Sequence, residues 1–186
     1  MNKQIIGVVV GSARKHSFSR AVANYLISKA PENSELRLID ISGLPMYNQD
    51  LDGAPPAEWV AFRDQIRQVD GVLLVTPEHN RSFPALLKNA LDVGSRPYGE
   101  SVWEGKPGGV VSVSPGALGG FGANHHLRQV LAFLDIPVLP QPEAYVGNIA
   151  SSLDESGAVA NENLKGFLDE YLEALVAWVN RLSTKA

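Results

Sequence analysis

The segment GSARKHSFSR, residues 11–20, places three serines and several cationic side chains directly after the apolar run at 5–10. Gly11 allows a tight departure from a strand, and Ser17 is placed to cap a helix whose first turn offers free N–H groups and a positive dipole end. Serine hydroxyls and the Arg14 guanidinium add donors, so the segment suits a phosphate dianion. The alternative is that the serines only cap the helix and the basic residues only face solvent.

The same segment lacks the patterns of two other phosphate-binding loops. It has no G-x-x-x-x-G-K-[ST] sequence, and Gly11 has no glycine partner at the spacing of the dinucleotide fingerprint G-x-G-x-x-G. A loop rich in side-chain donors holds a terminal monophosphate better than a bridging pyrophosphate. The sequence therefore favours a mononucleotide such as FMN over a dinucleotide as the tightly bound ligand.

A second unusual segment, TPEHNRSFPALLKNALD, occupies residues 76–92. Pro77 fixes the exit from the preceding strand, and Ser82 and Pro84 are expected to form the N-cap and first turn of a helix. We expect the backbone groups of 78–81 to have no regular partner, which leaves them free for the polar edge of a planar ring such as a flavin. The alternative is that Glu78 and His79 are solvated surface residues.

The third segment, SPGALGGFG, holds four glycines in the nine residues 114–122. Backbone without a Cβ can approach a ligand closely. A mobile surface linker is the alternative.

The apolar runs at 5–10, 71–76 and 108–113 are nearly continuous, which is typical of parallel strands buried on both faces. The alternating segment 35–41 and the short segment 136–139 are expected to be outer strands. Helical periodicities separate them, so five strands and five helices predict an α/β fold, a doubly wound three-layer α/β/α sandwich. Sheet orders 2-1-3-4-5 and 3-2-1-4-5 both remain open. Either order puts a ligand at the carboxyl ends of the central strands, where the three segments begin.

Composition narrows the function classes. The 186 residues, expected to form a single domain over 1–186, are 45% hydrophobic and carry a net charge of −4, which argues against nucleic acid as a partner. No cysteine is present, so disulfides, iron–sulfur clusters and a thiol nucleophile are excluded, and redox chemistry requires a borrowed cofactor. His125 and His126 are adjacent on an expected helix, so no metal site is expected there. The N-terminal apolar run is too short for a signal peptide or membrane span, so we expect a cytoplasmic protein without membrane contact.

Together, the three segments resemble the NADPH-dependent FMN reductase family, and within it the chromate and quinone reductases. GSARKHSFSR is similar to the family's phosphate loop, TPEHNRS with LKNALD to its flavin-ring signature, and SVSPGALGG to its third flavin-contacting loop. The segment LPMYNQDL, 44–51, also matches, and the similarity covers about 5–145. The resemblance implies a flavodoxin-like fold of order 2-1-3-4-5, non-covalent FMN and a homodimer or homotetramer.

The resemblance also implies the site and the reaction. The residues expected to bind the phosphate are Gly11, Ser12, Arg14, Ser17, Phe18 and Ser19, and those expected at the ring are Pro77, Glu78, His79, Asn80, Arg81, Ser114, Pro115 and Gly116. NADPH or NADH would deliver a hydride to FMN, and a small-molecule acceptor such as a quinone, chromate, an azo compound or a free flavin would take the electrons, with no catalytic side chain.

Two residues depart from the family pattern, because His79 stands where a tyrosine is usual and Ser19 where an asparagine is usual. A smaller ring that titrates near neutral pH at position 79 could change flavin affinity or potential, or the contacts between subunits. Two other functions stay open. One is a flavodoxin-like electron carrier that does not oxidise NAD(P)H itself, and the other is a domain that binds a different phosphorylated metabolite.

Overall fold

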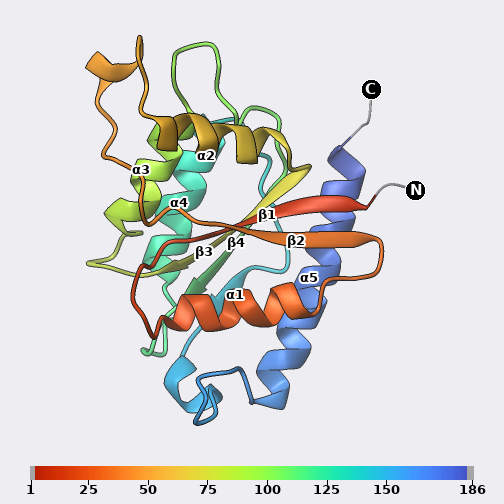
Figure 1. Ribbon diagram of the computed structural model, residues 1–186. Coiled ribbons are helices and arrows are strands. Elements are labelled where there is room, and N and C mark those ends of the chain that lie inside the picture. Colours follow the sequence, from red (N-terminus) through yellow and green to blue (C-terminus); the bar gives the residue numbers. More distant parts are fainter. Residues whose placement is uncertain (1–2, 184–186) are drawn as a thin grey trace.

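A computed structural model describes residues 3–183. Within that range five parallel strands form one sheet, in the order β2-β1-β3-β4-β5 (Figure 1). The strands are β1 Gln4–Val10, β2 Ser34–Ile39, β3 Gly71–Pro77, β4 Gly108–Val113 and β5 Ala144–Val146. The observed order confirms the doubly wound, flavodoxin-like arrangement and rules out the order 3-2-1-4-5.

Helices cover both faces of the sheet. They are α1 Phe18–Ser28, α2 Ala57–Arg67, α3 Ala85–Gly94, α4 Phe121–Phe133 and α5 Glu162–Leu182, with short 3₁₀ helices at Gln49–Leu51 and Ile149–Ser152. Helices α1 and α5 lie on one face, and α2, α3 and α4 on the other (Figure 1). The three-layer sandwich predicted from the sequence is confirmed.

The central strands have continuous apolar runs because helices cover both faces of the sheet. Val8 and Val10 of β1 enter the core beneath α1 and α5, whereas Val9 between them enters the core beneath α2, α3 and α4. In β3, Leu73 and Leu74 divide between the two cores in the same way. Successive side chains of a strand point to opposite faces, so a strand covered on both sides has apolar residues at every position.

The prediction of an outer strand at 136–139 is wrong. That segment makes only an isolated parallel bridge, Val138 with Gly108, and the strand beside β4 is instead β5 at 144–146. Proline has no N–H to donate to a ladder. Pro140 and Pro142 therefore interrupt pairing after Leu139, and pairing resumes only at Ala144.

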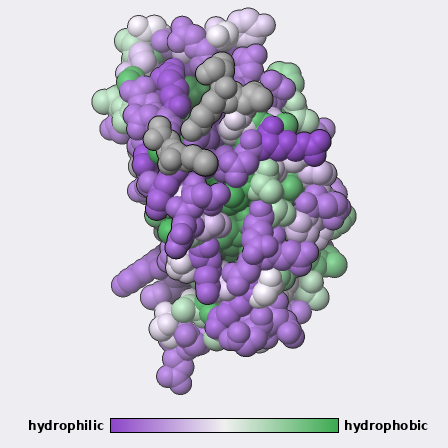
Figure 2. Space-filling view, turned by 90° about the vertical axis from the view of Figure 1, so that its right-hand side faces the viewer, coloured by the Kyte–Doolittle hydropathy of each residue, from purple (hydrophilic) through white to green (hydrophobic). Residues whose placement is uncertain are grey.

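The strands run from right to left in Figure 1, so their carboxyl ends and the loops of interest lie on the left. Figure 2 faces the opposite side, where β1 and β2 begin, and hydrophilic side chains cover most of it. Among residues 3–183, no helix combines the length and the apolar character needed to cross a membrane.

Candidate functional site

The three loops at the carboxyl ends of β1, β3 and β4 enclose a cavity of about 230 Å³, called the loop cavity below. Its lining consists of Ser12, Arg14, Ser17, Phe18, Ser19, Pro77, Glu78, His79, Val113, Ser114 and Pro115. Ten of the fourteen residues predicted from the sequence are in this set. Gly11, Asn80, Arg81 and Gly116 are not, and Val113 was not predicted. The structure thus brings together segments separated by almost a hundred positions in the chain.

The first loop is built around the start of α1. Ser17 is the N-cap, as predicted, because its Oγ accepts a hydrogen bond from the backbone N–H of Arg20 at 3.2 Å. The Arg14 guanidinium lies over the Phe18 ring, 5.6 Å from its centroid, and donates to the His16 carbonyl at 3.3 Å. A guanidinium held this way is already positioned beside the helix N-terminus, which suits an incoming anion.

Ser19 is the most informative residue of the loop. Its side chain is buried, 1% exposed, and its Oγ has no hydrogen-bond partner among residues 3–183. A buried hydroxyl without a partner is costly, and folded proteins rarely keep one without a reason. Because Ser19 lines the loop cavity, a phosphate oxygen there would satisfy it. The residues present therefore fit the phosphate end of FMN.

The second loop forms a tight two-residue turn. The N–H and C=O of His79 each pair with Ser82, at 2.8 and 2.9 Å. Asn80 and Arg81, at the tip, have φ values of 52° and 66° in the left-handed region. This geometry is typical of the type I′ turn. The prediction that the backbone of 78–81 lacks regular partners is therefore wrong for His79.

Glu78 has a structural partner that the sequence did not reveal. Its Oε2 accepts a hydrogen bond from the backbone N–H of Ala123 in the first turn of α4, at 3.0 Å, and its Oε1 pairs with Arg81 at 3.2 Å. The Glu78 side chain is 13% exposed, so it is not the solvated carboxylate that was the alternative. A carboxylate at a helix N-terminus is stabilised by the free N–H groups and the dipole.

Ser82 does not cap α3, contrary to the prediction. The helix begins at Ala85 with Pro84 in the cap position, and Ser82 is committed to the bridge with His79. Its Oγ instead lies 2.8 Å from His126 Nδ1 on α4. The sequence therefore predicted a turn here correctly, but it assigned the N-cap to Ser82, two residues before the cap position that the structure shows.

The glycine-rich third loop is fixed by hydrogen bonds rather than mobile. Gly116 donates its N–H to Ser114 Oγ at 3.1 Å, and its carbonyl accepts from Asn148 at 3.2 Å. Gly119 has a φ of +60°, and a Cβ there would lie 2.5 Å from the Tyr145 carbonyl carbon. The linker alternative is therefore wrong, and Ser114 is held where it lines the loop cavity.

Two histidines of α4 point to different neighbours, as their adjacent positions predicted. His125 Nε2 lies 2.9 Å from the Tyr145 hydroxyl, whereas His126 contacts Ser82 and packs edge-on against Phe83. Partial burial, together with a hydrogen bond to Glu143, raises the pKa of Tyr145 to about 12. The Tyr145 phenol is therefore neutral at physiological pH.

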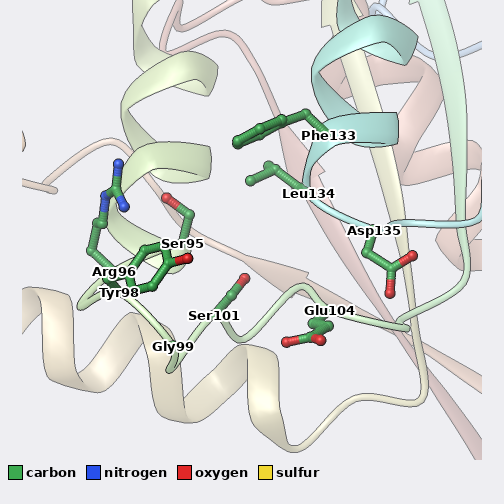
Figure 3. A pocket seen from close by; sticks show the side chains of 9 residues that line it. All are labelled: Ser95, Arg96, Tyr98, Gly99, Ser101, Glu104, Phe133, Leu134 and Asp135. Carbon is green, nitrogen blue, oxygen red and sulfur yellow. The ribbon is translucent and has the colours of Figure 1, made fainter.

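A larger cavity, of about 350 Å³, lies elsewhere (Figure 3). Its lining includes Arg96, Tyr98, Glu104, Phe133 and Asp135, and none of the fourteen predicted residues. The N–H of Gly105, three residues before β4 begins, donates to the Asp135 carbonyl, so this cavity lies at the amino end of the sheet. Ligands of open parallel sheets bind at the carboxyl ends. The loop cavity is therefore the candidate site.

A doubly wound sheet whose carboxyl edge carries a phosphate-suited loop in one cavity with two further loops defines a flavodoxin-like nucleotide-binding protein. The sequence pattern of the NADPH-dependent FMN reductase family matches residues 5–151. The chain belongs to this family, which confirms the resemblance seen in its motifs. It is accordingly an oxidoreductase that uses FMN and NAD(P)H.

Individual relatives agree with the family assignment. A quinone reductase from Pseudomonas putida is 54% identical over 175 residues, which cover 94% of both chains. A 2-hydroxy-1,4-benzoquinone reductase from Burkholderia sp. is 47% identical and is covered over 95% of its length by 94% of this chain. Among solved structures, the flavoenzyme NAD(P)H:(acceptor) oxidoreductase FerB from Paracoccus denitrificans is similar, with a TM-score of 0.90 and 36% identity over 96% of this chain and 98% of FerB.

Proposed function

We propose that this chain is a quinone reductase, taking electrons from NADPH or NADH through non-covalently bound FMN and passing them to a quinone. The observation that carries the proposal is the convergence of ten predicted residues from three loops on one cavity at the carboxyl edge of the sheet. The names of its relatives at 54% and 47% identity support a quinone as the acceptor.

The residues of the first loop are proposed to hold the FMN phosphate. Arg14 supplies the charge, and Ser12 and Ser17 line the same wall. Ser19 also lines the cavity, and its buried Oγ, which has no partner among residues 3–183, adds a donor beside it. Pro77, Glu78, His79, Ser114 and Pro115 line the remainder of the cavity, where the ring system would lie. When bound, FMN supplies the hydride acceptor and the electron donor that this cysteine-free chain lacks.

Gly11, Asn80, Arg81 and Gly116 support the site from outside the cavity lining. Gly11 donates its N–H to the Val75 carbonyl at 2.9 Å, which joins the start of the first loop to β3. Arg81, 75% exposed, balances the charge of Glu78 from the solvent side. We assign these residues to shaping the loops and not to contacting the ring.

Side-chain acid catalysis has little part in the proposed reaction. Both carboxylate oxygens of Glu78 are engaged, one by Ala123 and the other by Arg81, so Glu78 is not free to deliver a proton. The loop cavity opens to solvent, and a reduced quinone can take its protons from water. The role of the chain is to orient the cofactor and the two substrates.

A homodimer or homotetramer is part of the proposal, with a second copy of the chain covering the rim of the site. Leu118, within the glycine-rich loop, and Phe121, where that loop enters α4, are 65% and 51% exposed, although both are large and apolar. Such a patch next to a ligand site favours association. Sedimentation of the FMN-loaded protein tests this, since a monomer would contradict it. We place the protein in the cytoplasm, where reduced nicotinamide cofactors are available.

The test of the proposed function is an anaerobic turnover assay with 1,4-benzoquinone. We expect one NAD(P)H oxidised for each hydroquinone formed, with chromate, an azo dye and free FMN reduced more slowly in parallel reactions. Consumption of NAD(P)H that does not depend on the quinone would contradict the proposal. A flavin that is reduced only by a partner protein would instead indicate an electron carrier.

A further inference from the structure

A buried polar cluster lies behind the glycine-rich third loop. Ser112 is the one polar residue of β4, and Asn124 lies on α4; both side chains are 0% exposed. Arg128, one turn further along α4, is half-buried and is the third member. Burial of a polar side chain costs free energy unless it is hydrogen-bonded. The hydrogen bonds of these three residues, called the Ser112 network below, therefore indicate what the cluster does.

Arg128 fixes the orientation of the Asn124 amide. Its Nε donates to Asn124 Oδ1 at 2.8 Å, and its Nη1 donates to the Leu139 carbonyl at 3.1 Å. Because a guanidinium can only donate, the amide oxygen must face Arg128 and the amide nitrogen must point away from it. Asn124 Nδ2 then donates to Ser112 Oγ at 3.3 Å and to the Ala144 carbonyl at 3.2 Å.

The Ser112 hydroxyl has a single proton, and the third loop receives it. Ser112 Oγ lies 2.7 Å from the Gly119 carbonyl oxygen and 3.3 Å from that of Ala144. Asn124 already donates to the Ala144 carbonyl, so the hydroxyl proton is left for Gly119, in agreement with the shorter distance. The Ser112 network therefore ends on the backbone of the glycine-rich loop.

A short series of hydrogen bonds connects Gly119 to the loop cavity. Gly119 donates its N–H to the Gly116 carbonyl at 3.3 Å, and Gly116 donates its own N–H to Ser114 Oγ at 3.1 Å. Ser114 lines the loop cavity. Because Ser114 Oγ is the acceptor in its bond with Gly116, its hydroxyl proton is free to be donated to a ligand. A shift of the loop at Gly119 would therefore move a donor of the candidate site.

We infer that Ser112 is a positioning residue for the bound flavin. Its buried hydroxyl holds the third loop at Gly119, and this fixes the Ser114 hydroxyl where the polar edge of the ring would lie. The inference rests on the proposed function, because it requires FMN in the loop cavity. Ser112 is not part of the lining of that cavity, so it acts through the loop and not by contact with the cofactor.

The first test uses the FMN-free protein and measures amide hydrogen exchange of the segment 114–120. We expect faster exchange of this segment in Ser112→Ala, because Gly119 loses its donor. Ser34→Ala is the matched control. Ser34 on β2 is also buried, at 3% exposed, and its Oγ donates to the Pro31 carbonyl at 3.2 Å, at the amino end of the sheet. Exchange of 114–120 that is equal in the two variants would overturn the inference.

The second test measures the bound flavin. The FMN dissociation constant, from fluorescence titration, should rise about fivefold in Ser112→Ala and stay unchanged in Ser34→Ala. The visible circular dichroism of bound FMN should also change in Ser112→Ala alone. At saturating FMN this spectrum reports the surroundings of the ring, so a loss of stability without a loss of positioning would leave it unchanged. A spectrum of Ser112→Ala identical to that of the unmodified protein would overturn the inference.

Asn124→Asp tests the same role without removing the serine. The substitution keeps the size of the side chain and an oxygen facing Arg128, but it removes both N–H donors. The Ser112 hydroxyl should then turn to the carboxylate, and Gly119 should lose its donor. We expect faster exchange of 114–120 and an altered flavin spectrum, and values equal to those of the unmodified protein would overturn the inference. If the unmodified protein binds no FMN, the proposed function fails, while hydrogen exchange still decides whether Ser112 holds the loop.

Discussion

The Oε2 of Glu78 lies 3.0 Å from the backbone nitrogen of Ala123, so the loop that follows β3 is tied to the first turn of α4. Gly122, next to Ala123, makes this approach possible, because a Cβ there would lie 3.0 Å from the same oxygen. The two loops expected to meet the flavin ring are thereby fixed relative to each other.

Removal of the carboxylate should destabilise the fold. In Glu78→Ala the helix N-terminus loses a charge-assisted partner that is only 13% exposed, and we expect the free energy of unfolding to fall by about 2 kcal/mol. Urea denaturation of the FMN-free protein measures this. Glu155→Ala, an exposed site on the 153–159 turn, serves as the control and should change little. Equal stability of the two variants would contradict the structural role of Glu78.

Ser19→Ala should have opposite effects on stability and on binding. The substitution removes a buried hydroxyl that lacks a partner among residues 3–183, so the FMN-free protein should be as stable as the original or more stable, by up to about 1 kcal/mol. FMN binding should weaken about tenfold, because a donor to the phosphate is lost. Thermal unfolding and fluorescence titration check the two effects. A loss of stability together with unchanged FMN affinity would show that the hydroxyl serves the fold alone.

Arg14→Ala should weaken FMN binding more than any neutral change in the loop. The guanidinium lines the loop cavity and is held by Phe18 and His16, so its loss removes a positioned charge and should raise the dissociation constant at least about tenfold. Lys15→Ala is the control, since Lys15 is exposed, adjacent and outside the cavity lining. Fluorescence quenching of FMN gives both constants. Similar FMN dissociation constants for the two variants would show that Arg14 does not bind the phosphate.

A pair of glycine substitutions tests the fixed third loop. Gly119→Ala combines a φ of +60° with a Cβ placed 2.5 Å from the Tyr145 backbone, and should cost about 3 kcal/mol or more. Gly166→Ala lies within α5 where a Cβ meets open space, and should stabilise the protein by about 0.5 to 1 kcal/mol. Denaturation midpoints with unchanged m-values report both effects. A tolerated Gly119→Ala would mean that the loop adjusts freely.

The central part of the fold was predictable because its signals are local and strong. Continuous apolar runs identify β1, β3 and β4, and Ser17 was recognised as a cap from its position alone. The edge strand β5 was not predictable. It has only three residues, and the longer apolar segment at 136–139 gives the stronger strand signal in the sequence. Prolines lie in and after the segment 136–139, and proline weakens strand pairing. Only pairing with β4 in the folded sheet decides whether the residues before or after these prolines form the strand.

The candidate site was predictable as a set of loops but not as a set of contacts. The rule for open parallel sheets places the loops together, and ten predicted residues do meet in one cavity. The hydrogen bond that the Ala123 N–H donates to Glu78 joins residues 45 positions apart, so no local sequence pattern predicts it. The pairing of His79 with Ser82 likewise depends on the path of the folded backbone.

The most direct test of the central claim is the absorbance spectrum of the purified protein mixed with FMN, followed by anaerobic addition of NADPH and then NADH. We expect the shifted spectrum of bound flavin, its bleaching by a reduced nicotinamide, and its return when 1,4-benzoquinone is added. Absence of FMN binding, or bound FMN that neither nucleotide bleaches, would contradict it.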